Sequence, residues 1–370
     1  MSRKYISTAI VGDAHASDIL GVAVTKPFTI TCSSDGYLKF WENASSDRKL
    51  AFDQFVDSLG LHHVTAFEDT VNSKHVLVVA TVSFSGKCYL YSYDTTLTAL
   101  TNLPDQLTNS KISYWACQLT KDPNGERNML AVTTVTGRTE VFGLSFDEIP
   151  QLSYRGTAFA NDTSFATCVD GNVIQGGLAV GHQNGCVYVY DLEYLKLIYS
   201  FDSFGLKSNV ASSSLSTVRC VQFSPDGSLI AVARDSGPYG TVTLYDVKFG
   251  ETVGSLTMPT HSAAVGIGSY AHNSWCLSVS FNDDGTLIAS GGLDNKIRIW
   301  NVETKESEAV LIISRTDVAD VDKMNEIDKA SCVSLGFIDK GVNLAEGRND
   351  GLVVVGFDRA VRWYREAGGI

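Results

Sequence analysis

The stretch DNKIRIW, residues 294–300, joins a polar turn to a short apolar-rich strand that ends in Trp300. A second copy of this arrangement, DGYLKFW, occupies residues 35–41. In that copy Gly36 follows a short polar residue and permits a positive φ, which a two-residue hairpin turn needs in order to match the twist of its strands. Each stretch therefore predicts a β-hairpin whose second strand carries a large aromatic residue.

The spacing between the turn and the aromatic residue recurs along the whole chain. An aromatic residue stands six positions after a turn residue seven times, at Trp41, Tyr91, Phe142, Tyr190, Tyr245, Trp300 and Tyr364. The corresponding turn residues are Asp35, Ser85, Thr136, Asn184, Tyr239, Asp294 and Asp358. A four-stranded sheet repeated at this rhythm is a propeller blade, and seven blades close a ring. The sequence therefore predicts an all-β fold, a seven-bladed WD-repeat β-propeller.

Two of the repeats carry further polar residues that are typical of a WD repeat. The first repeat supplies His15, Thr31, Asp35 and Trp41. The sixth repeat supplies His272, Ser290, Asp294 and Trp300. In WD-repeat proteins such a quartet forms a buried hydrogen-bonded chain, so we interpret both as structural tetrads rather than as catalytic or metal sites. The other repeats keep only part of this pattern.

The two ends of the chain are expected to close the ring together. The last repeat ends with its third strand at Tyr364, and the residues after it are too few for a fourth strand. Residues 3–11 form a spare strand that we expect to complete the last blade and to cover its exposed edge. Residues 1–370 are then a single propeller domain. Its repeats exceed the roughly 40–45 residues of a compact WD repeat, and we place the excess in loops 202–216, 258–271 and 314–330, the last an acidic insertion.

Composition excludes several classes of function. The chain has 29 Lys and Arg against 41 Asp and Glu, a net charge of −12, and no run of basic residues, which argues against direct binding of nucleic acid. No apolar segment approaches the roughly 20 residues of a membrane span. The eight cysteines contain no C-x-x-C motif, and the N-terminal segment is too short and too polar for a secretory signal. These features predict a reduced, soluble, intracellular protein without membrane contact.

The sequence also lacks the common catalytic motifs. There is no G-x-S-x-G elbow, Walker loop, H-E-x-x-H or EF-hand loop. The seven histidines do not fall at metal-ligand spacing, and the adjacent pair His62 and His63 is expected to point to opposite faces of a strand. We therefore predict neither metal nor cofactor and no enzymatic activity. A propeller enzyme is the alternative, because such active sites assemble from several blades.

One face of the ring is the expected site for a partner. The start of each first strand and the turn before each third strand reach this face. Large apolar residues stand at these positions: Phe84, Trp115, Phe165, Trp275, Leu293 and Phe357. His63 and Asp18 occupy equivalent strand starts and complete the predicted partner-binding set. An exposed apolar cluster of this size usually marks an interaction site. The alternative is that the rings lie between the blades and merely cap the core.

Several segments resemble the WD-repeat subunit of the fungal Ski (superkiller) complex. They are SFSG (83–86), AHNSW (271–275), SFND (280–283), GLHHV (60–64) and the ending RWYREAGG (362–369). The resemblance covers the whole chain, and the terminal motif is far more specific than a generic WD repeat. The resemblance implies a propeller that acts as a non-catalytic scaffold.

The resemblance also implies partners. In that family two copies of the protein bind a tetratricopeptide-repeat subunit that carries an RNA helicase, and the assembly feeds RNA to the cytoplasmic exosome for 3′-to-5′ mRNA decay. Partners present a Gln-Arg motif followed by an aromatic or apolar residue. Carried over to this sequence, the aromatic anchors are Trp115, Phe165, Trp275 and Phe84, with Asp18 as a carboxylate for the arginine.

Alternative scaffold functions stay open at this point. The family also has a nuclear meiotic role, in which it bridges the double-strand-break protein to accessory factors, and one protein could perform both roles. We therefore expect a chain that is monomeric by itself and located in the cytoplasm, with the nucleus as a second site. A generic WD adaptor, such as a ubiquitin-ligase receptor, would be expected to add an F-box or a similar extension.

Overall fold

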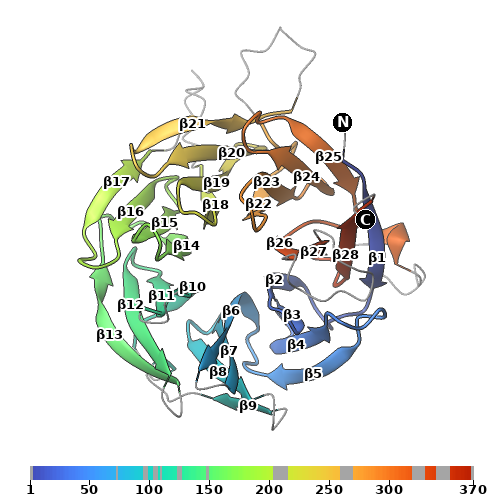
Figure 1. Cartoon of the computed structure of the whole chain (residues 1–370), viewed down its shortest axis with the longest axis horizontal. Coiled ribbons are helices and arrows are strands. Elements are labelled where there is room, and N and C mark those ends of the chain that lie inside the picture. Colours follow the sequence, from blue (N-terminus) through green and yellow to red (C-terminus); the bar gives the residue numbers. More distant parts are fainter. Residues whose placement is uncertain are drawn as a thin grey trace, which may run out of the picture.

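Seven four-stranded antiparallel sheets stand in a ring, as Figure 1 shows in a view along the ring axis. This computed structural model describes residues 3–71, 74–94, 99–102, 107–108, 111–122, 127–146, 150–202, 216–258, 270–318, 330–338 and 351–367. Each sheet is one blade. In six blades the first strand in chain order lies nearest the axis, and in the blade that joins the two chain ends β26 takes this place. The predicted seven-bladed β-propeller is confirmed.

Six blades follow the chain in order. Blade one contains β2 (Ile19–Val24), β3 (Phe28–Ser33), β4 (Tyr37–Glu42) and β5 (Leu50–Phe55). Blade two contains β6 (Leu61–Val71), β7 (Lys74–Ser83), β8 (Cys88–Asp94) and β9 (Ala99–Asn102). Blade three contains β10 (Tyr114–Thr120), β11 (Met129–Thr134), β12 (Thr139–Phe146) and β13 (Pro150–Ala158).

The next three blades repeat this arrangement. Blade four contains β14 (Ala166–Asn172), β15 (Gly177–His182), β16 (Val187–Asp191) and β17 (Leu197–Phe201). Blade five contains β18 (Val218–Phe223), β19 (Leu229–Ser236), β20 (Tyr239–Asp246) and β21 (Glu251–Leu256). Blade six contains β22 (Cys276–Phe281), β23 (Leu287–Gly292), β24 (Lys296–Asn301) and β25 (Ser307–Ile312).

Blade seven joins the two ends of the chain. It contains β26 (Ser334–Ile338), β27 (Gly351–Val355) and β28 (Val361–Glu366), and its outer strand is β1 (Tyr5–Val11). β1 runs antiparallel to β28, with Tyr5 opposite Glu366 and Val11 opposite Val361. Figure 1 shows the blue N-terminal strand beside the dark red C-terminal one. The predicted closure of the ring by the N-terminal strand is confirmed.

Arg3 ties this closing strand to two blades. Its Nε lies 2.5 Å from a carboxylate oxygen of Glu308 on β25, and its Nη1 lies 2.9 Å from Glu366 on β28. The Ala367 N–H donates to the Lys4 carbonyl over 2.6 Å and extends the pairing by one residue. Ion pairs at a surface contribute at most about 1 kcal/mol each. The backbone ladder is therefore the larger part of the attachment.

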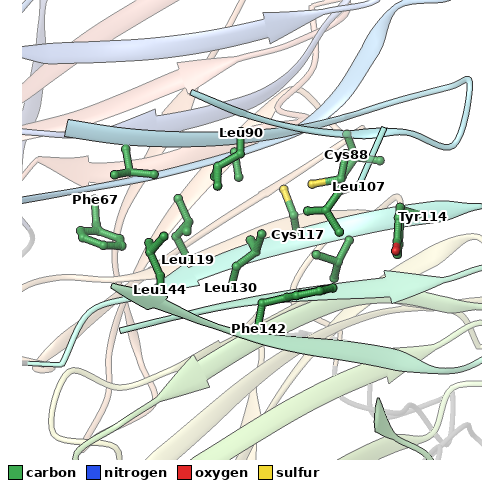
Figure 2. Close-up of a cluster of buried hydrophobic side chains, with 14 residues drawn as sticks. Phe67, Cys88, Leu90, Leu107, Tyr114, Cys117, Leu119, Leu130, Phe142 and Leu144 are labelled. Carbon is green, nitrogen blue, oxygen red and sulfur yellow. The ribbon is translucent and has the colours of Figure 1, made fainter. Parts of the chain in front are cut away.

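The core consists of clusters between neighbouring blades. All seven recurring aromatic residues are buried, and each lies in the cluster between its own blade and the preceding one. Figure 2 shows one example, in which Phe142 of blade three packs in a group that includes Leu90 of blade two. At the closure Trp41 meets Trp363 edge to face, 6.1 Å between ring centroids. The recurring aromatic residue thus sets the contact between blades.

The two predicted tetrads form hydrogen-bonded chains. In blade one His15 bridges Asp35 (3.0 Å) and Thr31 (2.8 Å), and Trp41 donates to Thr31 over 3.0 Å. Burial raises the pKa of Asp35, but hydrogen bonds from His15 and from backbone N–H groups outweigh this and lower it to about 2. The carboxylate is therefore a firm acceptor at neutral pH.

The tetrad of blade six has the same geometry. His272 lies 2.9 Å from Asp294 and 2.8 Å from Ser290, and Trp300 donates to Ser290 over 2.8 Å. Arg298 adds an ion pair to Asp294 at 3.0 Å. Each member is engaged with its neighbours in the fold, which is consistent with the structural interpretation of this quartet.

Blades two and four use a different acid. In blade two Asp57, from the loop before the first strand, accepts from Ser83, Ser85 and Tyr89 at 2.6–2.9 Å. In blade four Asp162 holds the same position and accepts from Ser164, Asn184 and Tyr188 at 2.7–2.9 Å. These two repeats keep a hydrogen-bonded polar chain, here half-buried, but take its carboxylate from the loop before the first strand.

The long loops are described only in part. Within 314–330 the structure contains a 3₁₀ helix, η1 (Arg315–Asp317), whereas 319–329 lie outside the described residues. Residues 203–215 and 259–269 of the two other predicted loops also lie outside them. The acidic insertion and the single-domain organisation stay predictions.

Candidate protein-binding pocket at the mouth of the ring

A pocket of about 500 Å³ opens where the first strands of the blades begin. Seven of the eight predicted partner-binding residues line it: His63, Phe84, Trp115, Phe165, Trp275, Leu293 and Phe357. The eighth, Asp18, is not among the lining residues, and its backbone carbonyl accepts from the Ser34 N–H over 3.0 Å. The structure thus brings seven of these side chains together, while their role in binding a partner stays a prediction.

The first strands of most blades are irregular where they begin, at the level of the pocket. In six blades the register between the first and second strands shifts near the start of the first strand. An extra residue in one strand of a pair re-aims its side chain away from the regular alternation. Residues within these irregularities that also line the pocket are Leu20, His62, Trp115, Thr167, Arg219 and Leu277.

Five lining residues were not identified as a group from the sequence. Leu20, Thr167, Arg219, Leu277 and Val333 each stand two positions after an aligned strand start. Residues two apart in a strand share a face, so these five residues could have been predicted to line the pocket below the strand starts. The prediction from the sequence used only the first position of each strand and did not include these residues.

Trp115 lies at the centre of one aromatic wall. Its ring stacks on His62 with centroids 4.2 Å apart and meets Phe165 edge to face at 4.8 Å. Phe84 approaches the same indole at 6.2 Å. This wall draws on three neighbouring blades and presents a broad apolar surface to the pocket.

Trp275 is held in place on the opposite side of the pocket. Its Nε1 donates to the Gly237 carbonyl over 2.9 Å, and the Arg219 guanidinium lies 4.8 Å from its ring centroid. Arg219 is in turn paired with Asp235 at 2.6 Å. The indole is fixed at one edge and one face, yet 40% of the residue is exposed.

The exposure of these rings decides between the two interpretations of the cluster. Phe84 is 47% exposed and Trp275 40%, and the other predicted pocket residues are half-buried. A ring that only capped the core would be buried like Tyr245 or Trp300, which have no exposed surface. The apolar cluster at the mouth therefore faces solvent.

The expectation that His62 and His63 point to opposite faces is wrong. Their Nδ1 atoms lie 2.7 Å apart, and both residues line the pocket. The register shift between Leu61 and His63 breaks the alternation of the strand at this point. Burial and, as a smaller cause, the neighbouring His63 lower the pKa of His62 to about 2. Burial also lowers the pKa of His63, to about 4. The pair is neutral near pH 7, with one ring donating to the other.

A second, narrower cavity continues along the axis below the mouth. Polar side chains here receive hydrogen bonds from the next blade: Asp170 accepts from the Phe223 N–H over 2.7 Å, and Gln222 accepts from the Phe281 N–H over 2.6 Å. Ser278 accepts from the Leu335 N–H over 3.2 Å in the same way. These bonds join the innermost strands of adjacent blades.

Asp170 predicts a pH dependence of stability. Burial raises the pKa of this carboxyl to about 7, although N–H donors from Phe223 and Gly171 oppose the rise. The contribution of Asp170 to the free energy of unfolding is complete below about pH 4, which is the pKa of an aspartate in the unfolded chain. It is lost as the pH rises from there through 7, because the folded chain then has to bury a charge. Asp170→Asn keeps an acceptor without the charge, so we expect its melting temperature to exceed that of the wild type by about 5 °C at pH 8 and by much less at pH 5.

Thermal unfolding followed by circular dichroism between pH 5 and pH 8 tests this prediction. Asp226→Asn is the matched control. Burial alone would raise the pKa of Asp226, but hydrogen bonds from Ser224 and Ser228 together outweigh it and lower that pKa. The effect of this substitution should not change over this range. If the melting temperatures of wild type and Asp170→Asn differed by the same amount at every pH, the raised pKa of Asp170 would be contradicted.

Two classes of site find no support in the described part of the chain. Among the described residues, no helix has the length and apolar character of a membrane span. Nor do three His, Cys, Asp or Glu side chains of that part of the chain gather in a way that could hold a metal ion.

Known proteins resemble this chain to different extents. Residues 208–246 and 266–301 match the family model "WD domain, G-beta repeat". Antiviral protein SKI8 of Saccharomyces cerevisiae is 36% identical over 403 residues, covering 100% of both chains. Meiotic recombination protein rec14 of Schizosaccharomyces pombe is 26% identical over 258 residues, which is 68% of this chain and 74% of rec14. The small ribosomal subunit protein RACK1 of the same yeast is 27% identical over 124 residues, about a third of each chain. The chain belongs to the SKI8 family of WD-repeat proteins, which confirms the family resemblance that its motifs indicated.

Proposed function

We propose that the chain is a non-catalytic adaptor subunit of a Ski-type complex. In this role the mouth pocket binds a tetratricopeptide-repeat protein that also carries an RNA helicase, and the assembly supports exosome-mediated 3′-to-5′ mRNA decay in the cytoplasm. The chain is monomeric by itself, and two copies enter the complex. Full-length similarity to SKI8 supports membership of such a complex.

The observation that carries the proposal is the apolar character of the pocket. Its aromatic walls come from at least four blades, and two of its rings, Phe84 and Trp275, are substantially exposed. A pocket of this size with aromatic walls suits one large side chain of a partner, and such buried anchors provide most of the affinity of a protein interface.

An adaptor is favoured over an enzyme by the polar groups along the axis. Among the described residues that line the two cavities, Arg219 is the only Arg or Lys and Asp170 the only Asp or Glu. Arg219 is paired with Asp235, and Asp170 accepts a backbone hydrogen bond. Both groups are therefore already engaged within the fold, which favours a binding site over a site for general acid–base catalysis.

The experiment is affinity purification of the tagged chain from native extract, followed by mass spectrometry. We expect the wild type to recover a tetratricopeptide-repeat protein and an RNA helicase. Trp275→Glu should lose both while its far-ultraviolet circular dichroism is unchanged, because it places a charge in the apolar mouth. Tyr194→Glu is the control, since Tyr194 is 67% exposed and lies outside the pocket. A folded wild type that recovers neither partner would overturn the proposal.

A meiotic role is the second candidate, and the similarity to rec14 favours it. In this role the same pocket bridges a double-strand-break protein to its accessory factors in the nucleus. Purification from vegetative and meiotic cells in parallel separates the two. If decay-complex partners are recovered from vegetative cells and recombination proteins from meiotic cells, and Trp275→Glu loses both, the same surface serves both roles.

A further inference from the structure

We infer that the mouth pocket selects a partner segment with an acidic group beside its apolar anchor, and that Arg219 is the residue that selects it. The inference rests on the proposed function, because it specifies the chemistry of the segment that the pocket binds. Four features of the described residues carry it: the charge of the lining, the geometry of Arg219, the place of Asp235, and the position of Trp275.

The lining carries a single kind of charge. Among the described lining residues of the mouth pocket, Arg219 is charged and no Asp or Glu is present. The other lining residues are apolar, aromatic or neutral polar side chains. Low-dielectric walls strengthen the attraction between a fixed cation and an incoming anion. The part of the pocket beside Arg219 therefore favours an anion over a cation.

Arg219 retains donors for a ligand. Its Nε and Nη2 both bind the same oxygen of Asp235, Oδ2, at 2.8 and 2.6 Å. Nη1 makes no hydrogen bond to the described part of the chain, and the side chain is 33% exposed. A guanidinium has five N–H donors in a planar fork. The remaining donors can bind a carboxylate, the anion that this fork matches best.

Asp235 supports Arg219 from behind the pocket wall. It is 4% exposed and does not line the pocket, so a ligand meets the guanidinium and not the carboxylate. Because Asp235 binds through one oxygen, it fixes the orientation of Arg219 without occupying both of its open edges. The pair holds the cation in place while leaving part of it available.

The position of Trp275 defines where the acid must stand. The guanidinium lies 4.8 Å from the Trp275 ring centroid. An anion bound to Arg219 therefore lies next to an apolar group that packs on Trp275. This subsite is separate from Asp18, which lies outside the lining and was predicted to bind an arginine.

Two probes that differ only in charge test the inference. N-acetyl-tryptophan carries a carboxylate, and N-acetyl-tryptophanamide is its neutral analogue. Each is titrated into the full ¹⁵N-labelled chain, and the Trp275 indole N–H resonance is followed by nuclear magnetic resonance. At low salt we expect the acid to bind about tenfold tighter than the amide. High salt should reduce this preference.

Three variants assign the preference to Arg219. Arg219→Gln should bring the ratio of the two affinities to about one, whereas Asp235→Asn should raise it above the wild-type value by removing the counter-charge. Arg127→Gln is the matched control, because Arg127 pairs with Asp122 at the other end of blade three and lies outside the pocket. Circular dichroism checks that each variant is folded.

Each outcome has one meaning. Equal binding of acid and amide to the wild type, or a preference that survives in Arg219→Gln, overturns the inference and leaves the docking pocket intact. Absence of binding by both probes overturns the pocket as a docking site, and the inference with it. A preference that is lost in Arg219→Gln and increased in Asp235→Asn supports it.

Discussion

Deletion of residues 1–12 is expected to lower the midpoint of thermal unfolding by on the order of 10 °C and to cause aggregation. The deletion removes β1, the outer strand of blade seven, together with its pairing to β28 and the ion pairs of Arg3. Each lost hydrogen bond contributes about 1 kcal/mol, and the apolar side chains of β1 lose their contacts as well. The newly exposed edge of β28 becomes a template for pairing with other chains.

Differential scanning calorimetry and light scattering measure the two effects. A chain that lacks only residues 1–2 is the control, because it keeps all of β1. A synthetic peptide of residues 3–12 added in trans should pair with β28 and restore part of the lost stability. Unchanged unfolding of the truncated chain would contradict the assignment of β1 as the strand that secures the ring.

Trp115→Ala is expected to weaken binding of the tetratricopeptide-repeat partner by at least about a hundredfold. The indole is in contact with His62 and Phe165, so truncation removes the centre of the aromatic wall rather than one ring at its edge. Central, desolvated aromatic residues typically carry several kcal/mol of an interface. Because Trp115 is half-buried and only borders the core cluster between blades three and four, the fold should persist.

Isothermal titration calorimetry with the purified partner gives the change in affinity. Tyr154→Ala is the control within the same blade, since Tyr154 is 60% exposed on the outer strand β13. Trp115→Phe should keep most of the affinity by retaining an aromatic ring. Full affinity in a folded Trp115→Ala chain would move the binding site away from this wall, and a common loss of fold and binding would make Trp115 a core residue.

The ring itself could be predicted because its signal is local and repeated. A turn residue and an aromatic residue six positions later, such as Asp294 and Trp300, occur once in each blade. The position of the aromatic residue between blades then follows from its size. Closure by the N-terminal strand was also predictable, because the last repeat lacked a fourth strand after Tyr364.

The detailed geometry of the pocket could not be predicted in the same way. A register shift leaves the apolar pattern of a strand almost unchanged, so the contact between His62 and His63 has no clear signature in the sequence. The carboxylates of blades two and four were missed for a different reason. Asp57 and Asp162 stand in another loop from Asp35 and Asp294, and only their common hydrogen-bonding role relates them.

If the mouth pocket binds the partner as proposed, the irregular strand starts separate recognition from folding. The aromatic residues between blades hold the ring together, whereas side chains at the six shifted positions, which include Leu20, Thr167 and Leu277, face the mouth. The backbone ladders do not use these side chains. Thr167 is an exception that ties to the fold, because its hydroxyl donates to the carbonyls of Gly181 and Val218. Randomising the other five codons, with Thr167 kept, would generate a library of specificities on one scaffold, with every variable position lining the same pocket.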